Sequence, residues 1–318
     1  MGEIKVIVSL GPSSLTKEHL QKMKDRDVSF VRINMSHSTL EDLEKSILMA
    51  KEVGIPFILD TEGSQVRNGE LLQNTITVEE GDEITLTGEE VISDGKRLTI
   101  KPKEIISQLE VGDILHCDFD TLILRVSEVG EEIKVKAVTG GFLGKNKGIA
   151  FDLARDRVLH MPVLSEKDEK AIQIGLKHGV EHVAASFMRR GSDIKFIREL
   201  SQGKMKIISK VECRDALDNL QGIIDETDYI LIDRGDLSKE VPIDMLPFLQ
   251  KLIIKKAGEK EVFVATNLLE TMINSRKPTR AEINDVMNTL VDGATGLTLS
   301  AETAIGKYPI ECVNTLNK

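Results

Sequence analysis

The sequence has few of the residues that build disulfide frameworks, base-stacking surfaces or membrane spans. It contains three cysteines, no tryptophan and two tyrosines among 318 residues. Three scattered cysteines are too few for a disulfide network or a zinc cluster, and so few aromatic rings disfavour single-strand nucleic-acid binding. No apolar run approaches the roughly 20 residues needed to cross a bilayer. Because the net charge is also −10, we expect neither nucleic acid nor a membrane as a partner.

The start of the sequence also lacks the pattern of a secretory signal. MGEIKVIVSLGPSS begins directly in a strand-like pattern, with no basic region followed by a long apolar one. We therefore expect a cytoplasmic protein, in keeping with the sparse cysteines. A hydrophobic fraction of 41% with 30% charged residues is typical of a globular protein with a real core.

Along most of the chain, short apolar runs of strand length alternate with amphipathic helical patterns. The runs are rich in Val and Ile and are continuous, as expected for strands that are buried on both faces. Eight such units predict an α/β fold, a parallel (β/α)₈ TIM barrel. The runs lie at residues 4–9, 28–33, 55–60, 182–187, 204–209, 229–233, 262–266 and 297–300.

One interval, residues 64–148, breaks this rhythm with short alternating strands such as TLILRV (121–126) and with Gly-Asp turns. The pattern predicts a small antiparallel all-β domain inserted after barrel strand 3. The predicted domains are therefore a barrel of residues 1–63 and 149–318 and a β-rich insertion of residues 64–148. Active sites of such barrels form at the end from which the insertion starts. A lid is the favoured function of the insertion, and a tolerated loop is the alternative.

Charged residues follow the predicted strands at the end where catalytic residues of barrels lie. Lys210 and Glu212 are two positions apart, so their side chains can point to the same side. Asp236 follows the next strand, and two carboxylates from adjacent strands suit Mg²⁺ or Mn²⁺. A salt bridge of Lys210 with either carboxylate is the structural alternative, and both interpretations can hold before substrate arrives.

At these positions the sequence resembles the pyruvate kinase family, in order and over nearly the whole chain. The resemblance implies a phosphotransferase that moves a phosphoryl group from phosphoenolpyruvate to ADP, giving pyruvate and ATP. It also implies Mg²⁺ or Mn²⁺ and K⁺ as cofactors. The motifs are SLGPSS (9–14), VRINMSHS (31–38), DTEGSQVR (60–67), IISKVEC (207–213), DRGDLSKE (233–240), VATNLLETMI (264–273), RKPTRAEINDV (276–286) and LSAETAIGKYPIE (299–311).

The resemblance assigns roles to the residues around the predicted metal site. Lys210 would neutralise charge on the transferred phosphoryl group, and Glu212 and Asp236 would hold the divalent ion. Thr266 would help to protonate the enolate carbon, although a lone threonine at a strand end is otherwise a structural residue. The backbone amides around Gly235, where the chain can approach closely, would receive the substrate carboxylate.

Other residues are assigned to the nucleotide and to potassium. Arg32 and Arg67 offer bidentate forks for phosphate oxygens, and they resemble residues that contact the nucleotide and the transferred group. His37 resembles a nucleotide-side histidine, and a partly buried structural histidine is the alternative. The potassium site of the family corresponds to four oxygen donors, Asn34, Ser36, Asp60 and Thr61.

Several residues near the expected site depart from the family pattern. Asp233 stands where the family has Ala, next to the expected position of the substrate carboxylate. If Asp233 faces the substrate, it would repel a carboxylate or need a cationic partner; if it faces the barrel wall, it can pair with an arginine such as Arg234. Cys213 is expected to be a small core residue. The other departures are Glu62, Ser64, Gln65, Ser238, Asn267 and the turn CDFDT (117–121).

Three functions follow from these observations. The first is pyruvate kinase activity, supported by the retained site residues. The second is a divergent paralogue that uses the metal-enolate site for another reaction, such as an aldolase or lyase step on a pyruvate-like substrate, supported by Asp233 and the changed turn. The third is a non-catalytic ligand-binding paralogue. We expect small-molecule partners and a homo-oligomer formed through the barrel. The sequence ends at Lys318, so we expect no control through the family's C-terminal regulatory domain.

Overall fold

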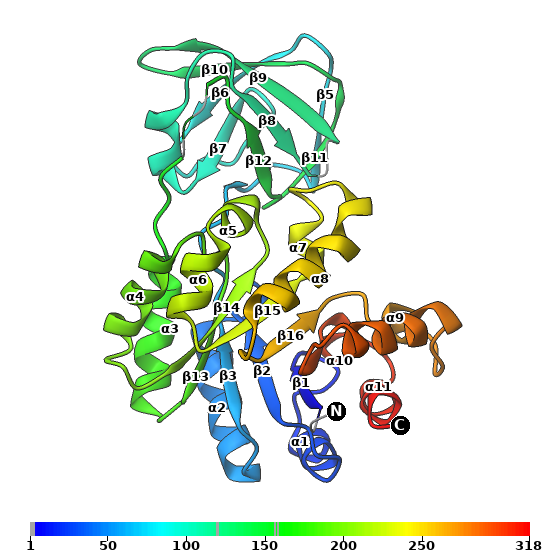
Figure 1. Cartoon of the computed structure of the whole chain (residues 1–318). Coiled ribbons are helices and arrows are strands. Elements are labelled where there is room, and N and C mark those ends of the chain that lie inside the picture. Colours follow the sequence, from blue (N-terminus) through cyan, green and yellow to red (C-terminus); the bar gives the residue numbers. More distant parts are fainter. Residues whose placement is uncertain (1–3, 119–120, 156, 158) are drawn as a thin grey trace. The chain divides into compact units, whose positions relative to one another are not determined.

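The computed structural model describes residues 4–118, 121–155, 157 and 159–318. The chain forms two compact units, each of which is described by itself (Figure 1). Unit 1 contains Met1–Gly63 and Val163–Lys318, and unit 2 contains Ser64–Pro162. Unit 2 is therefore an insertion in the sequence of unit 1. Within the described residues, no helix combines the length and the apolar character needed to cross a membrane.

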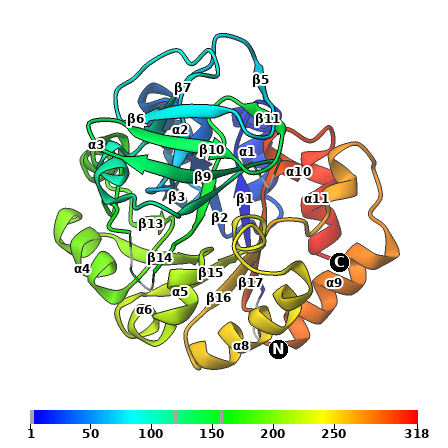
Figure 2. The ribbon, with the colours of Figure 1, turned by 90° about the horizontal axis from the view of Figure 1, so that it is seen from above.

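Unit 1 is a closed barrel of eight parallel strands, which confirms the predicted fold class. Figure 2 shows the ring of strands with the helices outside it. A cluster of buried side chains that includes Ile7, Ile208 and Phe263 fills the barrel interior. The strands, in chain order, are β1 (Lys5–Ser9), β2 (Phe30–Asn34), β3 (Phe57–Asp60), β13 (His182–Ala185), β14 (Lys206–Val211), β15 (Tyr229–Asp233), β16 (Val262–Ala265) and β17 (Gly296–Leu299).

Amphipathic helices pack their apolar faces against the outside of the barrel. Capping boxes formed by Ser165 with Asp168 and by Thr279 with Glu282 fix the N-termini of two of these helices. The longer helices are α1 (Lys17–Lys24), α2 (Leu40–Val53), α3 (Glu166–Lys177), α4 (Gly191–Leu200), α6 (Leu220–Glu226), α8 (Leu246–Ala257), α9 (Arg280–Val291) and α11 (Pro309–Leu316). Shorter turns are η1 (Met35–His37), α5 (Arg214–Asp218), α7 (Arg234–Leu237), η3 (Ile243–Met245), η4 (Glu270–Ile273) and α10 (Ala301–Ala304).

Unit 2 is rich in β-strands and has its own core, in which Leu98, Leu115 and Val135 are fully buried. A seven-stranded sheet has the order β12-β8-β9-β10-β6-β7-β4, and β11 pairs with β5. Most pairs are antiparallel as predicted, but β6 and β7 are parallel. The elements are β4 (Arg67–Asn68), β5 (Thr75–Val78), β6 (Glu83–Thr87), β7 (Arg97–Lys101), η2 (Lys103–Gln108), β8 (Ile114–Cys117), β9 (Leu122–Val129), β10 (Ile133–Ala137), β11 (Gly141–Gly144) and β12 (Ile149–Asp152).

Unit 2 ends later than the sequence predicted, at Pro162 instead of residue 148. The physical reason is pairing between segments far apart in sequence. Strand β12 pairs with β8, and the buried Asp113 forms an ion pair with Arg157. Cys117 is fully buried, but residues 119–120 of the expected turn at 117–121 lie outside the described residues.

Candidate active site

The carboxyl ends of the barrel strands bring a buried lysine among three carboxylates. The Lys210 side chain, near the end of β14, is 4% exposed. Its Nζ lies 3.0 Å from Glu212 Oε2 and 3.5 Å from an oxygen of each of Asp60 and Asp233. It also donates a hydrogen bond to Ser186 Oγ at 3.0 Å. Burial alone would lower the pKa of Lys210, but the three carboxylates raise it well above its ordinary value. Lys210 is therefore a fixed cation.

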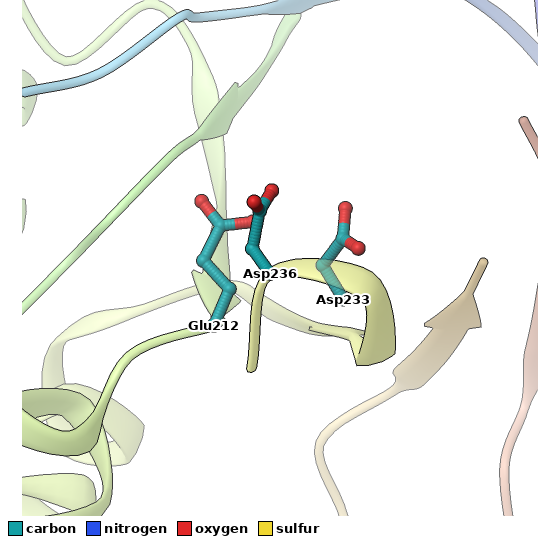
Figure 3. Close-up of side chains that lie close together, drawn as sticks. All are labelled: Glu212, Asp233 and Asp236. Carbon is teal, nitrogen blue, oxygen red and sulfur yellow. The ribbon is translucent and has the colours of Figure 1, made fainter. Parts of the chain in front are cut away.

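A second feature is the group of carboxylates formed by Glu212, Asp233 and Asp236 (Figure 3). One ligand atom of each lies within 4.8 Å of those of the other two. Glu212 Oε1 accepts a hydrogen bond from the backbone N–H of Phe187 at 2.8 Å. Burial, together with the negative charges of Asp236 and Asp233, raises the pKa of Glu212 to about 8 against the pull of Lys210. The group therefore places three carboxyl groups close together, two of them buried and that of Asp236 partly exposed.

These residues fit a divalent cation. Within the described part of the chain, Glu212 Oε2 has no hydrogen-bond partner, although Lys210 forms an ion pair with it. Asp236 is partly exposed and contacts Lys239 at 2.5 Å. Hard carboxylate oxygens that converge in this way suit Mg²⁺ or Mn²⁺. The structure brings the predicted ligands Glu212 and Asp236 together, and their role in metal binding stays a prediction.

Asp233 faces the site and contacts Thr266, Gly235 and Lys210. The Thr266 hydroxyl donates to Asp233 Oδ1 at 2.7 Å, and the Gly235 N–H donates to the same oxygen at 3.2 Å. Burial would raise the pKa of Asp233, but Lys210 and Thr266 together lower it. Arg234 pairs instead with Asp285, at 2.9 Å. Of the two orientations open to Asp233, the structure has the one toward the site, with Lys210 as the cationic partner.

The backbone around Thr266 is strained. Its φ of 78° lies in the left-handed region, which is rare for a β-branched residue. A Cβ at Gly235 would lie 2.7 Å from Thr266 Cγ2, so this position requires glycine. Strain of this kind persists only where the surrounding structure holds it. The position of the Thr266 hydroxyl is therefore set by the surrounding residues and not by the backbone conformation that a threonine prefers.

Arg32 lies in β2, on the other side of Asp60 from Lys210. Its Nη1 is 2.9 Å from Asp60 Oδ2, and its Nε donates to Ser9 Oγ at 2.7 Å. Its Nη2 donates to Ser300 Oγ at 3.1 Å. The Arg32 side chain is 3% exposed, so three contacts, with Asp60, Ser9 and Ser300, hold a second buried cation next to Lys210.

A cavity of about 540 Å³ lies beside Arg32. His37, which is exposed at the end of η1, lines this cavity together with Arg32 and Asn34. The structure therefore brings two of the three predicted nucleotide residues to one cavity. It is bounded by the loop after β1 and by α10, which supply Gly11 and Ala301. His37 is not the partly buried structural histidine of the alternative interpretation.

The comparison with known proteins decides the family. The model of the pyruvate kinase barrel domain matches residues 1–313. The chain belongs to the pyruvate kinase family. Relatives include the pyruvate kinases of Thermococcus litoralis, 34% identical over 99% of this chain and 68% of that protein, and of Thermotoga maritima, 34% identical over 100% and 70%. The pyruvate kinase of Geobacillus stearothermophilus is 31% identical over 99% of this chain and 56% of its own length.

Family membership confirms the resemblance. Several of the residues assigned to the potassium site, however, already have hydrogen-bond or ion-pair partners within the chain. Asn34 Oδ1 accepts from the backbone N–H of Ser36 at 2.8 Å, and Thr61 Oγ1 accepts from that of Ser186 at 2.9 Å. Both oxygens of Asp60 face Arg32 or Lys210. The potassium site of the pyruvate kinase family therefore stays a prediction for these residues.

The remaining predicted residues lie in different surroundings. Arg67 belongs to unit 2, where its Nη1 donates to the backbone oxygen of Asn146 at 3.0 Å, and its role at the site stays a prediction. Glu62 takes partners within unit 1, with an oxygen 3.3 Å from Lys167 Nζ. Burial raises the pKa of Cys213 well above its usual range. Its thiol stays protonated, as expected for a core residue.

Sequence reasoning assigned no role to Ser186 and missed the bond between Thr266 and Asp233. Ser186 Oγ accepts from Lys210 and donates to the backbone oxygen of Thr61 at 2.6 Å. Its position at the end of β13 was visible in the sequence, but its partners come from neighbouring strands. A rule that pairs polar residues at adjacent strand ends would have found both contacts.

Proposed function

We propose that the chain transfers a phosphoryl group from phosphoenolpyruvate to ADP and forms pyruvate and ATP. Family membership supports the reaction type. The observation that carries the proposal is the buried Lys210 at the end of β14, next to Glu212 and Asp236. Phosphoryl transfer depends mainly on positioning and electrostatic stabilisation, so a preformed buried cation beside carboxylates is the arrangement that it requires.

Lys210 and Arg32 would together stabilise the charge of the transferred group. Both contact Asp60, which is fully buried, through different oxygens, at 3.5 Å and 2.9 Å. Charges in a site that excludes water act more strongly than in water. Asp60 holds the two cations in place before the substrate arrives, so that little reorganisation is needed during transfer.

Glu212 and Asp236 would hold the divalent ion. Mg²⁺ or Mn²⁺ bound there would supply positive charge for the carboxylate and enolate oxygens of the substrate. The amide of Gly235 would receive the substrate carboxylate. Thr266 would hand the proton of its hydroxyl, through water, to the enolate carbon and regain a proton from solvent. We also assign K⁺ to the oxygen donors of the family site: Asn34, Ser36, Asp60 and Thr61.

The cavity beside Arg32 and His37 would take the phosphates of ADP. Its volume of about 540 Å³ is within the range of small-molecule sites. We further propose that Arg67 contributes to the nucleotide site and that unit 2 acts as a lid. A cytoplasmic location and a homo-oligomer through the barrel belong to the same proposal.

Variants of the site test the assignment. Pyruvate formation from phosphoenolpyruvate and ADP, with Mg²⁺ and K⁺, is followed in the wild type and in Lys210→Met. Loss of one preorganised charge contact at the transition state costs about 10²–10³ in turnover, so Lys210→Met should lose at least that much. The control is Lys22→Met, which removes an exposed lysine that is ion-paired with Glu18. Equal turnover of wild type and Lys210→Met would refute the proposed role.

A second candidate function is a metal-dependent reaction of another pyruvate-like substrate. Asp233 favours it, since this carboxylate stands within 3.5 Å of Lys210 at the site. In this case keto-acid turnover would depend on metal and would not need ADP. An absolute requirement for ADP in all product formation would exclude this candidate.

A further inference from the structure

The carboxylate of Asp233 engages three groups that the proposed function assigns to the substrate. Its Oδ1 accepts from the Thr266 hydroxyl at 2.7 Å and from the Gly235 N–H at 3.2 Å. Its Oδ2 lies 3.5 Å from Lys210 Nζ. Gly235 would otherwise be free to meet the carboxylate of a substrate, Thr266 its enolate carbon and Lys210 its phosphoryl group.

Asp233 is well held in this position. The residue is 7% exposed, and the positive charge of Lys210 helps to lower the pKa of its carboxyl. It therefore stays ionised at neutral pH. A substrate carboxylate that approaches the Gly235 amide meets a like charge that already occupies this donor, and like charges without an intervening cation repel.

The rival interpretation makes Asp233 a third ligand of the divalent ion. Its distance from Glu212 and Asp236, within 4.8 Å, permits this. Both oxygens of Asp233 are already engaged, however, with Oδ1 shared between two donors. In Figure 3 the carboxylates of Glu212 and Asp236 overlap in the view, and that of Asp233 stands apart from them.

We propose that Asp233 is a specificity-determining residue whose carboxylate, held by Thr266 and Lys210, competes with a ligand carboxylate for the amide of Gly235. The inference rests on the proposed function, because that function places the substrate carboxylate at Gly235. The site then discriminates against ligands that present a carboxylate at this position. It favours ligands that present a hydrogen-bond donor to Asp233, because specificity can come from a repulsive element as well as from attraction.

Binding of oxalate tests the proposal without any turnover. Oxalate is a small dicarboxylate, and its dissociation constant is measured by calorimetry at saturating Mn²⁺ for the wild type, Asp233→Ala and Asp233→Asn. Both variants should bind oxalate at least about tenfold more tightly, a difference of about 1.4 kcal/mol. Asp233→Asn keeps the shape and an acceptor for Thr266, so it serves even where Asp233→Ala fails to fold. Asp244→Asn, at an exposed position, is the matched control and should bind as the wild type does.

The possible results separate the two interpretations. Unchanged binding in Asp233→Asn would overturn the proposal. Weaker binding would also overturn it and would favour Asp233 as a metal ligand. If the variants bind oxalate more tightly but the wild type forms no pyruvate, the proposed function would be refuted while the role of Asp233 would stay intact. Where turnover exists, the KM for phosphoenolpyruvate should fall in Asp233→Asn more than kcat changes, which a purely structural role would not produce.

Discussion

Replacing Lys210 by methionine should destabilise the barrel in a way that depends on pH. The substitution keeps a similar side-chain length and removes a cation that lies 3.0 Å from Glu212 and 3.5 Å from both Asp60 and Asp233. The Coulomb energy of one such ion pair is roughly 5 kcal/mol at an effective dielectric constant of 20. Removing one partner of a buried ion pair costs about 3–5 kcal/mol in measured cases. We expect the free energy of unfolding of Lys210→Met to be lower than that of the wild type by about 3–5 kcal/mol at about pH 8.5.

The sign of the pH dependence follows from the carboxylates that remain. Lys210 lowers the pKa of Glu212 and of Asp233, so both pKa values rise in the variant. A carboxyl whose pKa is higher in the folded than in the unfolded state binds more protons when folded, and stability then falls as pH rises. The destabilisation by Lys210→Met should therefore be smaller at about pH 6 than at about pH 8.5.

Urea unfolding followed by circular dichroism at the two pH values measures this difference. Lys22→Met is the control, because its exposed pair with Glu18 is of the kind that contributes less than about 1 kcal/mol. A loss of unfolding free energy in Lys210→Met that is the same at both pH values, or no larger than in the control, would refute the electrostatic reasoning.

Three further predictions concern other parts of the molecule. Burial would raise the pKa of Asp113, but backbone N–H groups and Arg157 lower it below its usual range. The contribution of Asp113 to the stability of unit 2 should therefore be present above about pH 4 and be lost as the pH falls further. Asp113→Asn should remove this acid dependence in hydrogen exchange of the β8 amides, and an unchanged dependence would contradict the assignment. Gly235→Ala should cost about 1–3 kcal/mol in thermal unfolding, because the new Cβ would press on Thr266; a stability equal to wild type would show that the turn can yield. Arg32→Lys keeps the charge but loses the planar fork, so turnover should fall more than tenfold, an effect of about 1.4 kcal/mol in free energy, and full activity would exclude a role for the fork.

The fold could be predicted largely because the barrel strands carry a local signal. Strand β16, for example, is a continuous apolar run, and such runs indicate strands covered on both faces. The convergence of Lys210, Glu212 and Asp236 followed from the same signal, because all three stand at carboxyl ends of neighbouring parallel strands. In this barrel, the position in the strand order determines which side chains meet.

The features that the sequence did not predict depend on contacts between distant segments. The end of unit 2 is set by β12 pairing with β8 and by the Asp113–Arg157 ion pair. The parallel pairing of β6 with β7 is likewise invisible in a pattern of alternating residues. The orientation of Asp233 depends on the short turn of α7 and on donors from β14 and from the loop after β16. Two orientations fitted the sequence equally, and only the arrangement of Lys210 and Thr266 distinguishes them.

The stoichiometry of product formation tests the central claim most directly. Phosphorus NMR of a reaction with phosphoenolpyruvate, ADP, Mg²⁺ and K⁺ would follow ATP formation, while a coupled assay follows pyruvate in the same sample. The proposed phosphoryl transfer predicts one ATP for each pyruvate and no pyruvate without ADP. Product that forms without ATP, or a folded and metal-binding protein that forms neither, would contradict it.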